Sequence, residues 1–399
     1  NRGNIMNGKT PLEDIPIKIG KPKTTAAGIP AVISSAKHSL KKMGLTNTIK
    51  TLRMVNQKHG FDCPGCAWPD PEHRSSFEFC ENGAKAVADE AMKANVNAKF
   101  FAKYSVEELS GKSDYWLNNQ GRIHQPMYLG PGESNYSAIS WEKSLKLISG
   151  KINSLSSPNR AVFYTSGRTS NEAAFLYQAF VRVLGTNNMP DCSNMCHESS
   201  GKALIPTIGI GKGTVTLDDF NHADTILVIG QNPGTNHPRM LTALRDAKLK
   251  GAKIIHINPL PETGLVRFKH PQDYMTLNLA STGLADMHLQ VKIGGDAALL
   301  QAINKLTIDA GSIDDGFISK KTKSYEELAN SLKNIDWNRI ETDSGITRTQ
   351  IDELSNIIIN SKSIISCWAM GLTQHRNGVH VIQEVVNLHL LGGHIGRVG

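Results

Sequence analysis

The feature that most constrains the fold is a set of short apolar runs, each followed by a polar turn and a helical stretch. Residues 225–229, 253–257 and 364–368 are rich in Ile and Val, which is typical of strands buried on both faces of a parallel sheet. The segment between the first two runs carries Pro238, which suits the first turn of a helix. These runs predict a βαβ unit, and the chain is expected to be an α/β protein.

The turn after the first predicted strand is a candidate nucleotide site. Gly230 opens it at the carboxyl end of the strand, the edge at which open α/β sheets bind nucleotides. The turn lacks G-x-G-x-x-G, so the pattern alone fits a nucleotide site and a plain crossover equally well. Asn258 follows the second strand, where such units place a residue on a ribose or base, with Glu262 and Arg267 close behind.

A third unit begins with the strand at 364–368. It continues with a polar turn at 371–378 and a helix at 379–391 that ends before two glycines. Cys367 lies within the strand and is expected to be a core thiol. His375 fits an ordinary turn histidine as well as a ligand contact.

Residues 185–201 hold two cysteines and a histidine among small polar residues, and we expect them to form a loop after a helix. The preceding helix is predicted to begin with a capping box at Thr169 and Glu172 and to end at Gly185, after a short buried strand at 161–164. An earlier helix is predicted to begin at Ser140. A thiolate beside an imidazole can ligate a soft metal or act as a nucleophile, and two small buried cysteines are the third interpretation.

Three of the six cysteines lie between residues 63 and 80. Cys63 and Cys66 form a C-x-x-C loop with Pro and Gly inside it, and this favours a metal ion or cluster over a redox pair or structural thiols. Six cysteines in 399 residues do not make a disulfide framework, so a reducing, cytoplasmic location is expected.

Charge and hydropathy exclude several function classes. The 44 Lys and Arg against 36 Asp and Glu give a net charge of +8, but the basic residues are scattered and aromatic residues are few. This indicates weak attraction to anions such as phosphorylated cofactors, and no nucleic-acid partner is expected. The sequence has no apolar run of the ~18 residues that a membrane span needs.

Several motifs together resemble one enzyme family. They are Cys-Pro-Gly-Cys-Ala-Trp-Pro-Asp-Pro at 63–71, Thr-Ser-Gly-Arg-Thr-Ser-Asn-Glu at 165–172, Asp-Cys-Ser-Asn-Met-Cys-His at 191–197, and the turns at 230–238 and 371–378. From residue 60 to 399 the chain is similar to the molybdopterin-dependent oxidoreductases of the formate dehydrogenase/DMSO reductase superfamily, and within it to the FdhF/YdeP family. The resemblance implies an α/β, formate dehydrogenase/DMSO reductase-like fold with a small Fe-S N-terminal domain and parallel-sheet dinucleotide-binding-like domains.

The implied domain boundaries follow the motifs. Residues 1–60 are expected to be an extended N-terminal arm, 61–125 an iron-sulfur type domain, 126–190 the first part of a split α/β domain, and 191–399 an α/β molybdopterin-binding domain. Related enzymes continue with an arginine loop that binds the substrate carboxylate and a C-terminal domain. Both are missing from these residues, so the chain is expected to be a fragment that is inactive alone.

The resemblance also implies the site. Two molybdopterin guanine dinucleotides (bis-MGD) would hold a molybdenum or tungsten atom that Cys196 ligates, with His197 as the adjacent proton acceptor and Cys192 outside the ligand set. Lys85 would lie between a 4Fe-4S cluster and the pterin. The residues implied to bind the cofactor are Arg168, Gly230, Asn232, Gly234, His237, Asn258, Gly371, Thr373, Gln374 and Gly378.

The cluster motif departs from the family pattern. Cys63, Cys66 and Cys80 fit, but Asp70 stands at the third position, so the implied metal ligands are three thiolates and a carboxylate, with His73 as a further substitute. Three hypotheses stay open, and the departure at Asp70 favours only the third. The first is an oxidoreductase that oxidises formate or a similar small substrate and passes electrons to a partner protein. The second is reduction of an oxo-acceptor such as nitrate or an S- or N-oxide, and the third is a non-catalytic scaffold without a cluster.

Overall fold

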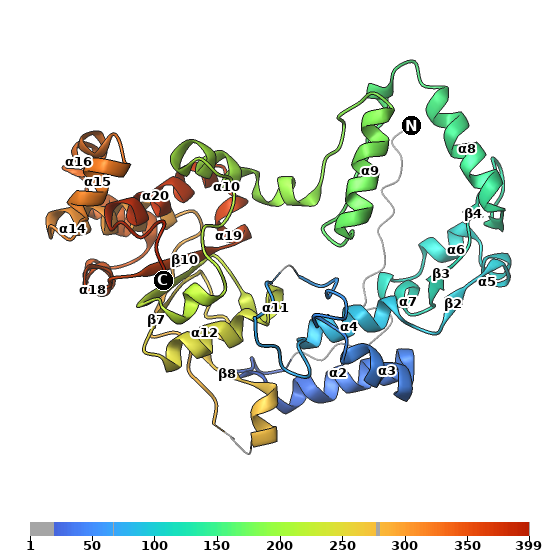
Figure 1. Cartoon of the computed structure of the whole chain (residues 1–399), viewed down its shortest axis with the longest axis horizontal. Helices are drawn as coiled ribbons and strands as arrows, with labels where there is room; N and C mark the ends of the chain where they lie inside the picture. The colour runs from blue at the N-terminus through green and yellow to red at the C-terminus, as the bar shows by residue number, and fades with distance from the viewer. Residues whose placement is uncertain (1–19, 67, 277–279, 399) are drawn as a thin grey trace. The chain divides into compact units, whose positions relative to one another are not determined.

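The computed structural model describes residues 20–66, 68–276 and 280–398 (Figure 1). The chain forms two compact units, each assembled from separate segments. The first unit comprises residues 1–22, 33–65 and 76–190, and the second comprises 23–32, 66–75 and 191–399. No helix of the described part of the chain is long and apolar enough to cross a membrane.

A parallel sheet of four strands forms the centre of the second unit. Its strand order is β10 (Ile364–Trp368), β6 (Thr225–Ile229), β7 (Lys253–Ile257) and β9 (Met287–Leu289), and all three pairings are parallel. The three strands predicted from the apolar runs are therefore confirmed at the expected residues. β9 is an additional short strand that the sequence analysis did not predict.

Alternate side chains of these strands enter two different cores. Leu227 and Ile229 pack in a large cluster with α10 (Cys192–Ile208), α14 (Asp296–Asp309), α18 (Arg348–Ile359) and α20 (Gly378–Leu391). Ile226 and Val228 pack on the other face with α12 (Met240–Leu249). Each such fully buried aliphatic side chain contributes about 1.5–3 kcal/mol. Helices thus cover both faces of the sheet.

The strand order places a topological switch point between β6 and β10. From β6 the chain passes through α12 to β7 and on to β9, and it then returns past the other face of the sheet to β10 on the opposite side of β6. Right-handed crossovers in opposite directions put their helices on opposite faces of the sheet. Ligands of open α/β sheets bind at such a point, outside the carboxyl ends of the strands.

The remaining elements of the second unit are short. The strand β1 (Ala26–Ala27) pairs in parallel with β8 (Phe268–Lys269). The others are η2 (Asp218–Asn221), α11 (Pro233–Asn236), α13 (Thr263–Val266), η3 (Pro271–Thr276), α15 (Asp315–Lys321), α16 (Tyr325–Leu332), α17 (Trp337–Ser344) and α19 (Met370–Thr373). Pro233 occupies the first turn of α11, and Pro238 precedes α12 without entering it.

The first unit is mostly helical, with a small core formed by Leu52, Val55, Ala84 and Val87. Its two strand pairs are β2 (Asn95–Val96) with β3 (Arg122–Ile123), in parallel, and β4 (Met127–Tyr128) with β5 (Ser137–Ala138), antiparallel. Its helices are α3 (Leu45–Leu52), α4 (Glu81–Glu90), α5 (Ala98–Lys103), α6 (Val106–Ser110), α7 (Asp114–Asn118), α8 (Trp141–Asn153), η1 (Pro158–Arg160) and α9 (Asn171–Val183).

The expectation of an extended arm over residues 1–60 is wrong for its second half. Residues 28–43 form helix α2 (Gly28–Met43), and α3 follows it after Gly44. Ala31, Ser35, Ser39 and Met43 are buried at intervals of four residues, which is the spacing of one helix face. Two of these four residues are serines, so the apolar periodicity is too weak to predict the helix. Residues 1–19 lie outside the described residues.

The predicted strand at 161–164 is not a strand. Phe163 is buried, but Val162 and Tyr164 are exposed on either side of it. The backbone N–H of Phe163 donates to Asn188 O at 2.9 Å, a single bond instead of a ladder. The helix that follows is capped by Ser170, whose hydroxyl accepts from Ala173 N, and not by the predicted Thr169.

Apolar side chains are exposed along α8 and α9 in the first unit. The cap at Ser140 and the helix after it are as predicted, but Trp141 is 68% exposed and Leu145 is 60% exposed. On α9, Phe175 and Leu176 are also exposed. Much of the apolar face of each helix is therefore not covered within the described residues of this unit, although Val181 of α9 is buried.

Candidate functional site

Two glycines bring the loops after β6 and β10 into backbone contact at the switch point. Gly371 N–H donates to Gly230 O at 3.1 Å. A Cβ on Gly371 would lie 2.5 Å from Gly230 Cα, closer than any side chain allows. Gly230 also has a φ of 57°, in the left-handed region that favours glycine. The structure thus brings together two of the residues predicted to bind a cofactor.

The loop after β6 makes a second close backbone contact, on its other side. A Cβ on Gly264, in α13 after β7, would lie 3.0 Å from Gly234 Cα. Asn232 caps the short helix α11 by accepting from Thr235 N at 3.1 Å. The loop is therefore held against the segments that follow both neighbouring strands.

A single carboxylate joins two predicted cofactor residues. Asn232 Nδ2 donates to Glu262 Oε2 at 2.7 Å, and Asn258 Nδ2 lies 3.3 Å from Glu262 Oε1. Asn258 Nδ2 also donates to Leu260 O at 2.9 Å. The sequence placed Glu262 just beyond the second strand, but it gave no sign that this side chain connects the two asparagines.

The segment with Cys192, Cys196 and His197 is a helix, so the expectation of a loop is wrong. Asp191 caps α10, and its Oδ1 accepts from Asn194 N at 2.7 Å. The helix bends at His197, whose φ of −124° and ψ of 19° are not helical. Cys196 and His197 therefore lie at a local distortion in the second turn of the helix.

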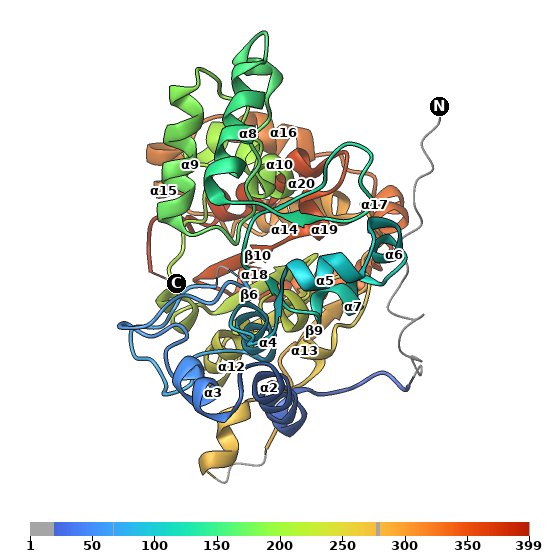
Figure 2. The same ribbon diagram turned by 90° about the vertical axis from the view of Figure 1, so that its right-hand side faces the viewer.

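Three side-chain bonds hold this part of α10 against the residues after β10. Ser199 Oγ donates to Thr373 O at 2.7 Å, and Trp368 Nε1 donates to Ser200 Oγ at 3.0 Å. Gln374 Nε2 lies 3.5 Å from Met195 O. The helices α10, α19 and α20 pack together in both views (Figures 1 and 2). Sequence reasoning missed Ser199 and Ser200.

The fold also brings Gly378 to this contact. A Cβ on Gly378, the first residue of α20, would lie 3.3 Å from Ser199 Oγ. Thr373, Gln374 and Gly378 therefore all border the helix that carries Cys196 and His197. These residues come from segments about 180 positions apart in the sequence.

Two imidazoles lie near each other in this region. Partial desolvation of the ring lowers the pKa of His197, whose Nδ1 is 3.4 Å from Ser200 Oγ. Burial lowers the pKa of His237, and the positive charge of a protonated His197 lowers it further. Gln231 Nε2 is 3.3 Å from His237 Nδ1. Both rings are therefore neutral at neutral pH and can accept a proton.

A buried carboxyl group and a histidine lie close to each other at the N-terminus of α14. Burial raises the pKa of Asp296 to about 6, and the charge of His375 opposes this shift. His375 therefore lies close enough to Asp296 to affect its ionisation. In β10, Cys367 is partly buried and packs against the core on the α12 side of the sheet, and burial raises the pKa of its thiol to about 12.

Two of the predicted metal ligands lie together in the first unit. Gly65 N–H donates to Cys63 Sγ at 3.3 Å, and Gly83 N–H donates to Cys80 Sγ at 3.3 Å. A Cβ on Gly83 would lie 2.9 Å from Cys63 Sγ and 3.6 Å from Cys80 Sγ, so only glycine leaves room beside both sulfurs. Such N–H donors stabilise thiolates.

The other predicted metal ligands are placed differently. Cys66 begins a segment of the second unit. Asp70, in the same segment, pairs through Oδ1 with Arg239 at 2.7 Å and through Oδ2 with Arg74 at 3.5 Å. Nowhere in residues 20–66, 68–276 and 280–398 do three or more His, Cys, Asp or Glu side chains form a group that fits a metal ion. The predicted four-ligand set is therefore not assembled there.

Two predicted site residues belong to the first unit. Lys85 pairs with Glu81 across one turn of α4, at 2.7 Å between Nζ and Oε1. Arg168 lies in the turn before α9, where its backbone N–H donates to Ser166 Oγ at 3.2 Å. No role for either residue follows from these contacts.

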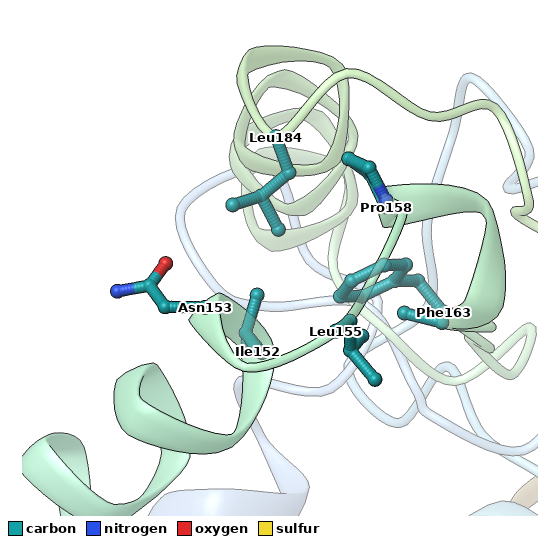
Figure 3. Close-up of a pocket in the computed structure, with 7 residues that line it drawn as sticks. Ile152, Asn153, Leu155, Pro158, Phe163 and Leu184 are labelled. Carbon is teal, nitrogen blue, oxygen red and sulfur yellow. The ribbon is translucent and has the colours of Figure 1, made fainter.

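A pocket of about 200 Å³ lies between the end of α8 and the end of α9 in the first unit (Figure 3). Ile152 and Leu155 line it from the chain around the end of α8, and Phe163 and Leu184 complete an apolar wall. Its lining contains no titratable or nucleophilic side chain. This pocket therefore offers packing space and no catalytic group.

Comparison with known families supports the resemblance seen in the sequence. A family model described as molybdopterin oxidoreductase matches residues 122–399. In the solved structure of the acetylene hydratase of Pelobacter acetylenicus, a chain is similar to 68% of this chain with a TM-score of 0.56 and 19% identity, over 35% of its own length. That likeness concerns the fold alone.

Relatives are similar over most of this chain. An uncharacterized oxidoreductase of Mycobacterium tuberculosis is 49% identical over 390 residues, which are 96% of this chain and 50% of the relative. The protein YdeP of Escherichia coli is 46% identical over 96% of this chain and 52% of its own length. The F420-dependent formate dehydrogenase 1 subunit alpha of Methanococcus maripaludis is 31% identical over 71% of this chain and 39% of its own length. The chain thus spans about half the length of its two more similar relatives.

Proposed function

Because this chain belongs to the molybdopterin oxidoreductase family, we propose that it supplies one side of a bis-MGD binding site in a formate dehydrogenase-like enzyme. The observation that carries the proposal is the meeting of three segments at the switch point. Gly230 and Gly371 bring the loops after β6 and β10 together, and Ser199 holds the helix with Cys196 against the second loop. Ligands of open α/β sheets bind at this place.

The residues present suit a phosphorylated dinucleotide. Glycine at positions 230, 234 and 371 lets the backbones of these loops lie in direct contact with their neighbours, which forms glycine turns at the carboxyl ends of the strands. Peptide N–H groups in such glycine turns bind pyrophosphate oxygens. Glu262 offers carboxylate oxygens held by Asn232 and Asn258, and carboxylates accept hydrogen bonds from ribose hydroxyls or a guanine. His237 is a further neutral donor or acceptor in the same loop.

Cys196 and His197 carry the proposed chemistry. The Cys196 thiolate is a soft ligand that suits molybdenum or tungsten. The bound cofactor would supply two-electron oxidation and reduction at the metal. Oxidation of formate to carbon dioxide releases one proton with two electrons, and His197, neutral because its pKa is lowered, accepts that proton. Ser200, beside His197 Nδ1, orients the ring.

An iron-sulfur cluster at Cys63, Cys66 and Cys80 is also part of this proposal, although these three thiols do not form a metal-binding group in the described residues. Its support is the N–H donors that face Cys63 and Cys80. Asp70 does not fit as the fourth ligand, because its two oxygens are paired with arginines. Lys85 and Arg168 keep their expected roles beside the cofactors as proposals. An electron-acceptor protein in the cytoplasm is proposed as the partner, and the six free cysteines are consistent with that compartment.

The test is elemental and nucleotide analysis of the intact protein, purified without oxygen. We expect one molybdenum or tungsten and two guanine dinucleotides per chain, and formate-dependent dye reduction. Cys196→Ala should abolish dye reduction, and Cys192→Ala, on the same helix, should keep it. Loss of dye reduction in the Cys192 variant alone would refute the assignment of the ligand.

Other outcomes separate the remaining hypotheses. A metal-loaded protein that is inert toward formate but oxidises reduced dye with nitrate or an S- or N-oxide would point to oxo-acceptor reduction. A protein with neither metal nor guanine nucleotide would support the non-catalytic scaffold.

A further inference from the structure

The segment at residues 66–75, where the third cluster ligand is expected, is bound to the second unit at three points. The ring of Trp68 packs edge-to-face on Phe220 with a centroid distance of 5.7 Å. Asp70 pairs with Arg239, and Gln272 Nε2 lies 3.1 Å from Ser75 Oγ. Residue 67 lies outside the described residues. An apolar contact, an ion pair and a hydrogen bond therefore fix this segment along its length.

In the central contact, each carboxylate oxygen of Asp70 lies near an arginine side chain. Arg239 approaches Oδ1 at 2.7 Å and Arg74 approaches Oδ2 at 3.5 Å. The side chain of Asp70 is 16% exposed and that of Arg239 is 11% exposed, so water screens the pair little. Removing one partner of such a partly buried ion pair leaves the other charge without compensation, which is costly. A metal ion would have to displace a buried guanidinium from Asp70 Oδ1.

The partner of Asp70 lies at the end of the proposed dinucleotide loop. Arg239 follows His237 and Pro238 and directly precedes α12. Met240 N–H donates to His237 O at 2.8 Å, so the backbone around Arg239 is continuous with the turn that places His237. The other end of this loop, Gly230, is fixed by its contact with Gly371.

We propose that Asp70 is a positioning residue that holds Arg239, and through it the loop at 230–239, and that it does not ligate a metal. Residue 70 stands where the family pattern has a cluster cysteine, but in this chain it has a different role. It anchors the cofactor-binding loop to the segment that begins at Cys66. The anchoring of the loop rests on the proposed function, whereas the ion pair itself does not.

A double-mutant cycle on the intact protein tests the ion pair. Asp70→Asn and Arg239→Gln should each lower the apparent Tm by about 4–8 °C, because each leaves a partly buried charge without its partner. The double variant should lie close to either single variant. Additive losses in Tm would overturn the proposal, since they would mean that the two side chains act independently.

A neighbouring ion pair provides the control for the loop. Arg245, on α12, pairs with Asp273 at 3.1 Å, and these side chains are 17% and 20% exposed. Asp273→Asn should lower the Tm to a similar extent but leave the guanine nucleotide content unchanged. Asp70→Asn and Arg239→Gln should both reduce the guanine released per chain on denaturation. Equal guanine content in all three variants and in the wild type would refute the proposal that Asp70 and Arg239 anchor the loop.

Iron content tests whether Asp70 is a ligand. We expect the same iron per chain in the wild type, Asp70→Asn, Asp70→Cys and Arg239→Gln. Loss of iron in Asp70→Asn with retention in Arg239→Gln would overturn the proposal, as would a gain of iron in Asp70→Cys. A wild type that binds neither iron nor guanine nucleotide would refute the proposed function, and the Tm cycle would still decide whether Asp70 and Arg239 act as a pair.

Discussion

Replacing Gly371 with alanine tests the contact on which the site is built. The added Cβ would lie 2.5 Å from Gly230 Cα, 2.5 Å from Gly230 O and 2.8 Å from Gly230 C. All three atoms are backbone, so no flexible side chain can move aside. The loops after β6 and β10 must separate by about 1 Å to reach ordinary contact distance. Overpacking of this kind typically costs 1–3 kcal/mol, and this rigid site belongs at the upper end.

The assay is thermal unfolding together with guanine content. For a unit of about 200 residues, 3 kcal/mol corresponds to a fall in Tm of roughly 6–12 °C. Gly150→Ala is the matched control, because a Cβ on Gly150, within α8, would have no atom within 4 Å. That change should raise helix stability by up to about 1 kcal/mol. If the Tm of the Gly371→Ala variant is no lower than that of the Gly150→Ala variant, the loops after β6 and β10 do not approach each other as closely as described.

Three further changes have signs that follow from buried polar groups. Burial lowers the pKa of His389 to about 3, so as the pH falls below 6.5 the unfolded chain takes up a proton that the folded chain does not. The free energy of unfolding should therefore drop between pH 6.5 and 4. Measured as Tm against pH, this drop should be less steep in His389→Gln. Asp296 should destabilise the fold at high pH instead, because its raised pKa of about 6 means that ionisation opposes folding by about 3 kcal/mol at pH 8. Asp296→Asn should therefore raise the Tm at pH 8 and have little effect at pH 4. An equal change in Tm at both pH values would refute this. Glu384→Ala should lower the Tm by roughly 4–8 °C, because it removes the carboxylate that accepts from Asn304 Nδ2 at 3.0 Å and from Gln301 Nε2 at 3.1 Å, whereas the bond from Asn304 Nδ2 to Glu384 O stays. Glu384→Gln should lose less, with calorimetry as the measurement.

The sheet was predictable because its strands follow a local rule. Three runs of aliphatic residues are buried on both faces, and each appears as a strand at the predicted positions. Gly230 was noted from its place after a strand, and Gly371 was implied by the family resemblance; the structure brings the two into contact. The segment at 161–164 has the same apolar composition but no neighbouring strand, and no local pattern carries that information.

The site residues were predictable in part. The family resemblance singled out Cys196 and His197, and the fold holds the helix that carries them against Thr373 and Gln374 through Ser199 and Met195. Their helical conformation was missed, because Ser, Asn and Cys are weak helix formers and the cap at Asp191 acts only once the helix is packed.

Pairings between distant residues could not be predicted at all. Asp70 with Arg239 spans a large separation in sequence, and so does Asn232 with Glu262. In both cases the side chains are ordinary surface types, and only the folded chain shows which partner each one has.

The apolar side chains on α8 and α9 determine how a preparation of these residues behaves in solution. Trp141 and Leu145 on one helix, and Phe175 and Leu176 on the other, expose indole, phenyl and isobutyl groups to water. Surfaces of this kind associate with each other as concentration rises, and the attraction strengthens with added sulfate. Light scattering should therefore increase with ammonium sulfate well before unfolding, and replacing Leu145 and Leu176 with lysine should suppress that increase while leaving the Tm unchanged.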